Sequence, residues 1–255
     1  MAELTEPSER ALEVARSECA LLVDAGAEAV FLTGSHARGQ GHPESDLDVR
    51  VLGDGSSPPL KRHDEFLVST SWSTRREQED AFRDPAEVGE VVPGWRSAVV
   101  LHDPDGIAAE FKRRAESWTW DEVAERADAW VAEQVTDYAE EVHTLVSNAQ
   151  SARDDAAAAI RSQLAMHVAK FLAVRHRLLY ESENQLWTEI ATVMGDDYTR
   201  LQRIALGVVA APLERSCEAA LELFVIAARD TRSLLDDTQR AVVEHASSLR
   251  LEANE

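Results

Sequence analysis

Two kinds of hydrophobic periodicity occupy different parts of the sequence, and their order is the strongest constraint on the fold. Before residue 103, short apolar runs alternate with turns, and Ser45–Leu52 alternates polar and apolar side chains as a strand does. After residue 103, apolar residues recur at the spacing of amphipathic helices almost throughout. This order indicates an α+β domain followed by an all-α domain. We expect a small mixed-sheet domain over residues 1–118 and a helical domain over residues 119–255.

The same patterns predict the individual elements. The first part should contain a helix at Ser8–Val23 and a short helix within Ser73–Pro93. Four strands are predicted at Ala29–Leu32, Ser45–Leu52, Phe66–Trp72 and Ser97–His102. Asp103-Pro104-Asp105 has the composition of a helix start, with an N-cap acid and a proline at the first position. The helices predicted from there on are Asp105–Ser117, Trp120–Ser147, Ala152–Tyr180, Gln185–Met194, Leu213–Leu234 and Thr238–Leu249.

The chain is strongly acidic. It has 47 Asp and Glu residues against 26 Lys and Arg, a formal net charge of −21. A field of this sign repels nucleic acids and anionic membrane surfaces, so neither is expected as a partner, and small or cationic substrates are favoured. Excess acid with only three lysines also resembles the acidic proteomes of salt-loving organisms, where screening weakens self-repulsion.

Two further features of the sequence indicate the cellular compartment of the protein. No run of about 18 apolar residues occurs, and residues 1–7 lack the basic and then apolar order of a signal peptide, so we expect a cytoplasmic protein. Cys19 and Cys217 lie far apart in apolar segments of helical pattern. We expect both to be buried free thiols rather than a disulfide or metal ligands.

The segment from Phe31 to Asp48 carries the chemistry. A buried strand runs into Gly34-Ser35, and such a turn at a helix start brings backbone N–H groups and a hydroxyl close to bound phosphates. Asp46 and Asp48 stand two apart on a strand, so they project from the same face. Converging carboxylates are suitable ligands for divalent cations. The pattern therefore predicts a joint phosphate and metal site.

The order strand, Gly34-Ser35, ten residues, Asp46-x-Asp48, strand resembles the motif of the nucleotidyltransferase superfamily that includes DNA polymerase β. It is most similar to the aminoglycoside-type members and the minimal nucleotidyltransferase domains. An α+β domain followed by a helical domain is also how the antibiotic-modifying members look, so the resemblance covers most of the chain. It implies an enzyme that transfers a nucleoside monophosphate from ATP or another NTP to a hydroxyl, with magnesium and with release of pyrophosphate.

The resemblance also implies roles for individual residues. Gly34 and Ser35 would hold the β- and γ-phosphates, and Asp46 and Asp48 would ligate Mg²⁺ as the catalytic acids. Arg38 is close enough to the turn to neutralise the triphosphate, and its alternative role is an ion pair on the short helix. We expect His36 to be structural rather than a base.

A basic cluster in the helical domain is a second candidate contact for the triphosphate. Lys170 would bind the nucleotide if the two domains close over it, as an electrostatic clamp. Arg175, His176 and Arg177 belong to the same cluster. The alternative is that these side chains pair with neighbouring acids such as Glu181 and Glu183.

One acid of the family pattern is missing. Members of this kind have a third carboxylate on a later strand, whereas the corresponding strand here places Ser69 and Ser71 on the expected face. Asp64 and Glu65 precede that strand and would serve only in a shifted register. A general base would then come from elsewhere. The candidates, for which surface solvation is the alternative, are Glu77, Glu79 and Asp80.

Two classes of function follow. The first is a nucleotidyltransferase acting on a small molecule, for which the acidic charge favours an aminoglycoside-like acceptor. The second is a catalytically weakened nucleotide-binding regulator or antitoxin-like module, suggested by the missing acid. A nucleotidyltransferase that modifies a protein side chain lies between them.

Overall fold

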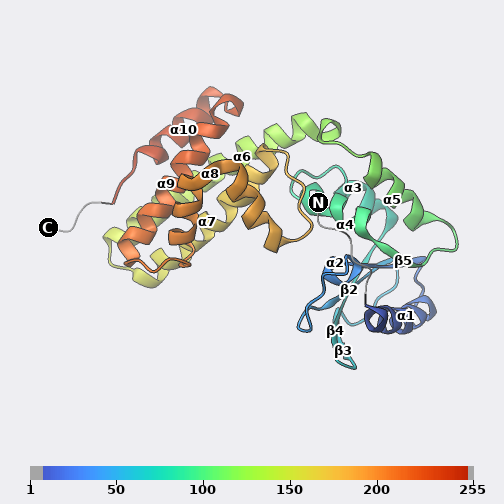
Figure 1. Cartoon of the computed structure of the whole chain (residues 1–255). Helices are drawn as coiled ribbons and strands as arrows, with labels where there is room; N and C mark the ends of the chain where they lie inside the picture. Colours follow the sequence, from blue (N-terminus) through green and yellow to red (C-terminus); the bar gives the residue numbers. More distant parts are fainter. Residues whose placement is uncertain (1–7, 252–255) are drawn as a thin grey trace. The chain divides into compact units, whose positions relative to one another are not determined.

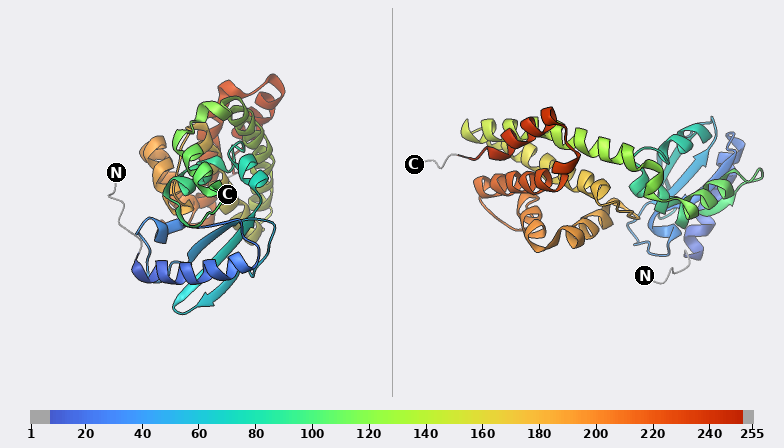
Figure 2. Two further views of the ribbon diagram at one scale, coloured as in Figure 1. Left: turned by 90° about the vertical axis from the view of Figure 1, so that its right-hand side faces the viewer. Right: turned by 90° about the horizontal axis from the view of Figure 1, so that it is seen from above.

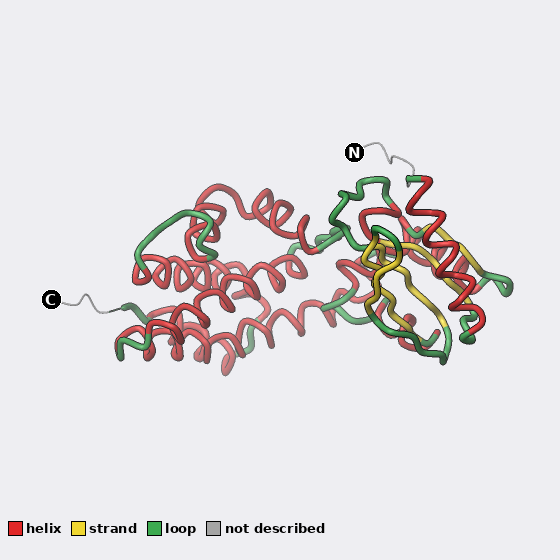
Figure 3. The backbone as a smooth tube through the Cα atoms, turned by 90° about the horizontal axis from the view of Figure 1, so that it is seen from below, coloured by secondary structure: helices red, strands yellow, loops and turns green. Residues whose placement is uncertain are grey.

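The computed structural model describes residues 8–251, which form two compact units that divide between Glu122 and Val123. The division predicted from the sequence falls at residue 118. Residues 1–7, for which the sequence pattern predicts no signal peptide, lie outside the described residues. All strands belong to the first unit, and the second consists of helices and the turns between them (Figure 3). The chain therefore has the α+β fold class that the periodicity predicts, with the helical segments after the sheet.

Within the described residues the first unit has one five-stranded sheet, in the order β3-β4-β2-β1-β5. Its strands are β1 (Ala29–Thr33), β2 (Leu47–Leu52), β3 (Leu60–His63), β4 (Phe66–Ser73) and β5 (Val99–His102). Strands β2 and β4 are parallel, and the other neighbours are antiparallel. The sequence does not predict β3, because a strand of Leu-Lys-Arg-His contains none of the strongly strand-forming residues.

One face of this sheet is covered by α1 (Glu9–Asp24), as Figure 1 shows. The helix contributes Val14 and Leu22 to a buried cluster, and the strands contribute Leu32 and Val49. Burying each such side chain contributes about 1.5–3 kcal/mol. This face of the sheet is therefore closed by hydrophobic packing.

The opposite face is covered differently. The Phe31 ring of β1 stacks on Trp95 with 4.2 Å between centroids, and Trp95 stacks on Phe111 at 5.1 Å. These aromatic side chains come from β1, α4 and α5, and the remaining short helices of the unit are α2 and α3. Their bounds are Gly34–Ala37 for α2, Arg75–Ala81 for α3, Val88–Ser97 for α4 and Ile107–Ser117 for α5. On β2 and β4, by contrast, Asp48 and Ser69 are only partly buried on this face.

The helix α5 begins later than predicted. Asp103 does act as a cap, because its carboxylate accepts hydrogen bonds from the backbone N–H groups of Ala108 and Ala109 at 3.1 and 2.9 Å. The residues between them form a turn that ends in Gly106, whose φ of 75° is left-handed. The proline that we expected at the first helical position therefore lies in this turn.

The second unit is a helical bundle (Figure 2). Helices α6, α7, α8, α9 and α10 all contribute to one buried cluster that includes Phe171 and Leu223. Its helices are α6 (Ala124–Gln150), α7 (Asp154–Arg175), α8 (Glu183–Ala205), α9 (Leu213–Thr231) and α10 (Asp237–Ser248). A short 3-10 turn, η1 (Trp120–Val123), lies at the division between the units, and another, η2 (Arg232–Leu234), follows α9. The turn predicted after Met194 is a kink at Gly195, with φ 82°, beyond which α8 resumes.

Two expectations about composition can be compared with the structure. Cys19 and Cys217 are buried and free, as predicted, and burial raises the pKa of both thiols. Within residues 8–251, no helix has both the length and the apolar content needed to cross a bilayer.

Candidate active site

Gly34 and Asp48, fourteen positions apart in the sequence, are in contact where β1 ends. Thr33, the last residue of β1, is the register partner of Asp48 on β2, and α2 starts at the next residue. Gly34 has a φ of 72°, and a Cβ built on it would lie 2.2 Å from Asp48 Oδ2. Only glycine accommodates both this backbone angle and the adjoining carboxylate. Folding thus sets the glycine turn beside the second aspartate of the motif.

The two aspartates interact. Asp46 is exposed and lies just before β2 rather than on the predicted strand, whereas the Asp48 side chain is 23% exposed. Burial raises the pKa of Asp48 above its ordinary value of 3.8, and the negative charge of Asp46 raises it further. The positive charges of Arg50, Arg38 and His36 act in the opposite direction. A cation between the two carboxylates would offset the energetic cost of burying the Asp48 charge and the repulsion between the two negative charges.

This pair suits one magnesium ion that is shared with a substrate. Among the described residues, no group of three or more His, Cys, Asp and Glu side chains is arranged to hold a metal. Magnesium in nucleotide sites is usually held by one or two carboxylates, and phosphate oxygens and water complete its shell. Asp46 and Asp48 meet that requirement, because the Gly34-Ser35 turn adjoins Asp48.

His36, the residue after Gly34-Ser35, is a packed side chain. It is buried, its Nε2 lies 3.4 Å from the carbonyl oxygen of Ser45, and its ring meets Phe66 edge-on at 5.3 Å. A Cβ on Gly41 would lie 2.2 Å from its Nδ1, so the loop closes tightly over the ring. These contacts agree with a structural role.

Arg38 brings a buried positive charge to the same place. Its exposed fraction is 4%, and its Nε donates a hydrogen bond to Gln40 Oε1 at 3.4 Å. Its charge also acts on Asp48. A guanidinium next to the glycine turn is suited to phosphate oxygens, which it binds through charge-assisted hydrogen bonds.

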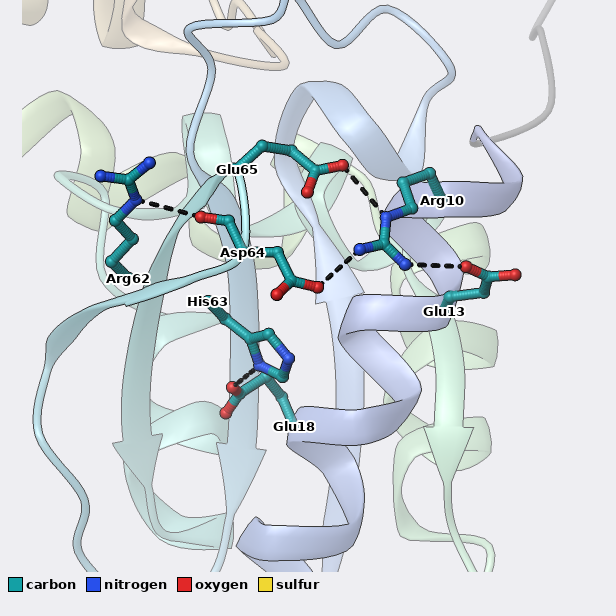
Figure 4. A network of polar contacts seen from close by, with 7 residues as sticks. All are labelled: Arg10, Glu13, Glu18, Arg62, His63, Asp64 and Glu65. Atoms are coloured by element: carbon teal, nitrogen blue, oxygen red, sulfur yellow. Dashed lines mark hydrogen bonds and ion pairs between the residues drawn. The ribbon is translucent and has the colours of Figure 1, made fainter.

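The position beside Asp48 on β4 belongs to Ser69. The parallel register pairs these two residues directly, so the register shift that would bring in Asp64 or Glu65 does not occur. Those two acids precede β4 and pair with Arg10 instead, at 2.5 and 3.0 Å (Figure 4). The hydrogen bond from Arg10 lowers the pKa of Glu65. A hydroxyl therefore stands where the family pattern has its third carboxylate.

Arg50 is a charged residue of this face that the motif alone does not identify. It lies two positions after Asp48 on β2, so both side chains share a face. Its Nη1 donates a hydrogen bond to Ser71 Oγ at 2.6 Å, and its Nη2 is 3.9 Å from Asp48 Oδ1. The signal in the sequence is the alternation Asp46, Asp48, Arg50, which continues the acidic motif with a cation.

Comparison with known families bears on this arrangement. The family described as nucleotidyltransferase domain matches residues 19–149, which is more than half of the chain. The chain belongs to this nucleotidyltransferase family. The matched range contains both halves of the motif and extends beyond the division at Val123 into α6.

The chain is also similar to a solved structure, that of a nucleotidyltransferase-like protein from Exiguobacterium sibiricum. The two share 12% sequence identity with a TM-score of 0.49, over 88% of this chain and 74% of the other. A comparison with curated proteins found no match.

The candidate general bases lie on α3, and each has a partner on this helix or next to it. Glu77 completes a capping box, in which its Oε2 accepts hydrogen bonds from the backbone N–H of Thr74 at 2.7 Å and from the Thr74 hydroxyl at 3.0 Å. These bonds lower the pKa of Glu77. Glu79 and Asp80 form exposed ion pairs with arginines of the same segment at 3.3 to 3.9 Å. The contacts of all three fit the surface alternative.

Lys170, the predicted second contact for the nucleotide, lies on α7 in the helical unit. Its Nζ is 3.0 Å from Glu183 Oε1, and both side chains are substantially exposed. Exposed pairs of this kind are weak and exchange readily with solvent. The proposed contact of Lys170 with phosphate stays a prediction.

The other members of the basic cluster are paired with acids from distant parts of the helical unit. Arg175 Nε and His176 Nε2 lie 3.3 and 3.2 Å from Asp230 Oδ2. Arg177 Nη2 lies 2.6 Å from Asp128 Oδ1. The sequence did not indicate these two acids, because they approach α7 only when α6 and α9 pack against it.

Proposed function

We propose that this protein transfers a nucleoside monophosphate from ATP or another NTP to the hydroxyl of a small molecule, with Mg²⁺ and release of pyrophosphate. Membership of the family supports nucleotidyl transfer in general. The observation that carries the proposal is the contact between the Gly34 backbone and the Asp48 carboxylate. It sets a turn suited to phosphate beside an acid suited to metal.

In the proposed mechanism, Gly34 and Ser35 bind the β- and γ-phosphates. The first N–H groups of a helix have no partner within the helix and are available to phosphate oxygens. Arg38 offsets negative charge from its buried position. Asp46 and Asp48 hold Mg²⁺, which when bound supplies Lewis-acid polarisation of the phosphate.

The reaction exchanges one P–O bond for another. The acceptor hydroxyl attacks the α-phosphorus, and the bond from that phosphorus to the oxygen bridging to the β-phosphate breaks. Pyrophosphate leaves, and the hydroxyl gives up its proton to a water molecule. Ser69, beside Asp48, can accept a hydrogen bond from the acceptor and so orient it, although a serine hydroxyl is not a base at neutral pH.

This last point favours a second candidate function. With a hydroxyl in place of the third carboxylate, the protein can bind a nucleotide without turning it over efficiently. It would then act as a nucleotide-dependent regulator or antitoxin-like module. The two functions share the Gly34, Ser35, Asp46 and Asp48 site and differ in catalysis.

Incubation with Mg²⁺, labelled ATP and a panel of hydroxyl compounds tests the enzyme. We expect a labelled adduct and stoichiometric pyrophosphate. The net charge of −21 supports including aminoglycosides in the panel, and a protein substrate covers the protein-modifying alternative. The same charge supports our proposal that nucleic acid is not an acceptor. A folded sample that releases no pyrophosphate with any member contradicts the enzyme.

Transfer assays and binding calorimetry with Ser69→Asp separate the two functions. Faster transfer by this variant supports a transferase whose base is weakened. Binding of Mg·ATP without transfer, in both the wild type and the variant, supports the binding module. Ser56→Asp, in an exposed loop away from Asp48, is the control.

A further inference from the structure

The face of β4 and β3 next to Asp48 carries side chains that the phosphate and metal site does not use. Ser69 on β4 pairs with Asp48 on one side and with Leu60 of β3 on the other, so the three form one row across the sheet. In the adjacent row on one side, Arg50 of β2 pairs with Ser71 of β4. In the adjacent row on the other side, Leu67 of β4 pairs with Arg62 of β3. We call this surface the open shelf, and it consists of Arg50, Leu60, Arg62, Leu67, Ser69 and Ser71.

The contacts of β3 show that the open shelf and α1 lie on opposite sides of the sheet. Lys61 and His63 both contact the buried Glu18 of α1, and the distance from His63 Nδ1 to Glu18 Oε1 is 2.5 Å. Leu60 and Arg62 alternate with these residues and therefore face the other side. Figure 4 shows Arg62 pointing away from Glu18.

The open shelf is cationic in a chain of net charge −21. Arg50 is 46% exposed and directs one N–H group to Ser71 Oγ. Arg62 is also exposed, and its Nε donates a hydrogen bond to the Asp64 carbonyl oxygen at 3.0 Å. A guanidinium has five N–H donors in a fork that matches the oxygens of carboxylate or phosphate. Both side chains are thus held in place by one hydrogen bond each, and each guanidinium has further N–H donors.

The same surface is partly apolar. Leu60 and Leu67 are 54% and 47% exposed, although large aliphatic residues are usually buried. The register places them as diagonal neighbours on adjacent strands, which are within reach of one another. Together they offer a non-polar surface next to the two arginines.

We propose that the open shelf binds the acceptor, and that the acceptor is a hydroxylated molecule with an anionic group, a carboxylate or a phosphate, and a non-polar part. The proposal rests on the proposed function, because it sets the reacting hydroxyl at Ser69 beside Asp48. The anionic group binds Arg50. The non-polar part lies over Leu60, two strand spacings or about 10 Å from Asp48, and over Leu67, which is on the adjacent strand β4 two residues before Ser69.

This acceptor has the opposite charge to the one that the net charge favours. An aminoglycoside would bring several positive charges next to Arg50 and Arg62, and like charges at short range repel. The net charge acts at long range and is screened by salt, whereas the two arginines act at the site itself. The local charges therefore decide the class of acceptor.

Four probes test the charge and the apolar part separately. β-Hydroxyoctanoate and its amide have the same hydroxyl and chain but differ in charge. β-Hydroxybutyrate keeps the charge and lacks the chain, and kanamycin is a polycation. Each is assayed for transfer with Mg²⁺ and ATP, and for binding by calorimetry in the presence of Mg²⁺ and the unreactive α,β-methylene analogue of ATP.

We expect β-hydroxyoctanoate to be preferred over its amide by about tenfold, the effect of one charge-assisted hydrogen-bonding contact. It should also be preferred over β-hydroxybutyrate and kanamycin. Arg50→Gln should abolish the preference for charge, with Arg50→Lys intermediate. Arg75→Gln is the matched control, because Arg75 is an exposed arginine that pairs with Glu79 and Glu110 on helices.

The outcomes distinguish this inference from the proposed function. If the wild type binds no ATP in the presence of Mg²⁺, the proposed function fails. If ATP binds but the acid and the amide are equivalent, or kanamycin is preferred, the inference is overturned. If Arg50→Gln causes no loss of preference, the inference is overturned as well, because the anionic group would then bind elsewhere. An equal loss in Arg75→Gln would show that the preference reflects overall charge.

Discussion

The two faces of the sheet use charged residues in opposite ways. On the face covered by α1, the buried carboxylate of Glu18 contacts both Lys61 and His63, and aliphatic side chains surround it. On the other face, Asp48 lies beside another acid and a glycine, and burial and the charge of Asp46 raise its pKa. Charge on the first face is balanced by direct contacts within the protein, whereas the pKa of Asp48 stays raised even though Arg50, Arg38 and His36 act against the shift.

This difference gives a physical criterion for function. A charge that stabilises the fold should lower stability when it is removed and leave ligand binding unchanged. Removal of a charge that binds a ligand should weaken ligand binding without lowering stability, because such a charge destabilises the folded protein when no ligand is bound. The four predictions below test whether the two faces separate in this way.

The largest effect is expected for Asp48→Ala. Loss of the metal ligand on the open face should lower the affinity for Mg·ATP at least about 100-fold, or ~2.7 kcal/mol, without loss of stability. Titration calorimetry and thermal unfolding measure the two quantities. Asp54→Ala, in an exposed loop, is the control. Unchanged nucleotide binding in Asp48→Ala would disprove the site.

Gly34→Ala should affect both quantities, because Gly34 belongs to the fold and to the site. The left-handed backbone costs an alanine ~1–2 kcal/mol, and the close approach to Asp48 costs a similar amount, so we expect a loss of about 3 kcal/mol. Gly26→Ala is the matched control, since Gly26 also has a positive φ but no atom within 4 Å of its Cβ position. Denaturant unfolding of the two variants measures the difference, and equal losses would show that contact with Asp48 has no energetic weight.

Glu18→Gln should lower stability and leave the site intact. We expect a loss of ~2 kcal/mol, less than the ~3–5 kcal/mol of a fully buried pair, because Lys61 and His63 remain partly exposed to water. Glu13→Gln on the same helix removes only an exposed pair with Arg10 and should cost under ~1 kcal/mol. A weaker affinity of Glu18→Gln for Mg·ATP would contradict the separation of the two faces.

The smallest effect is a pH-dependent gain of stability in Asp48→Asn. Since the pKa of Asp48 is raised in the folded protein, its ionised form is destabilising above that pKa, and the penalty disappears below the ordinary value of 3.8. In the absence of metal, the variant should therefore melt at a higher temperature than the wild type at neutral pH and at the same temperature near pH 3. Melting curves across this range measure the effect, and a variant that is less stable at neutral pH would contradict it.

Regular periodicity allowed most of the fold to be predicted. The strand alternation of Ser45–Leu52 and the helical spacing beyond residue 103 correspond to β2 and to the helices of the second unit. Strand β3 was missed because it has no strongly strand-forming residues and because Lys61 and His63 are held against α1 by ion pairs with Glu18 rather than by hydrophobic packing. A pattern based on apolar residues cannot detect that kind of contact.

The candidate site was predictable to the extent that its residues are close in sequence. Gly34-Ser35 and Asp46-x-Asp48 form a short motif, and alternation placed Ser69 on the expected face. The open shelf was not predictable, since it depends on which strands become neighbours. Leu60 and Arg62 join Ser69 only through a hairpin that the sequence did not indicate.

The contact between Gly34 and Asp48 also has a consequence for how such a protein evolves. No side chain fits at position 34 while a carboxylate occupies position 48 in this arrangement. Random drift that replaces the glycine therefore makes the aspartate unfavourable, and loss of the aspartate removes the steric demand for glycine. We expect the two positions to change together among descendants of this sequence, so that a lineage which abandons nucleotide chemistry loses both residues within a few substitutions of each other.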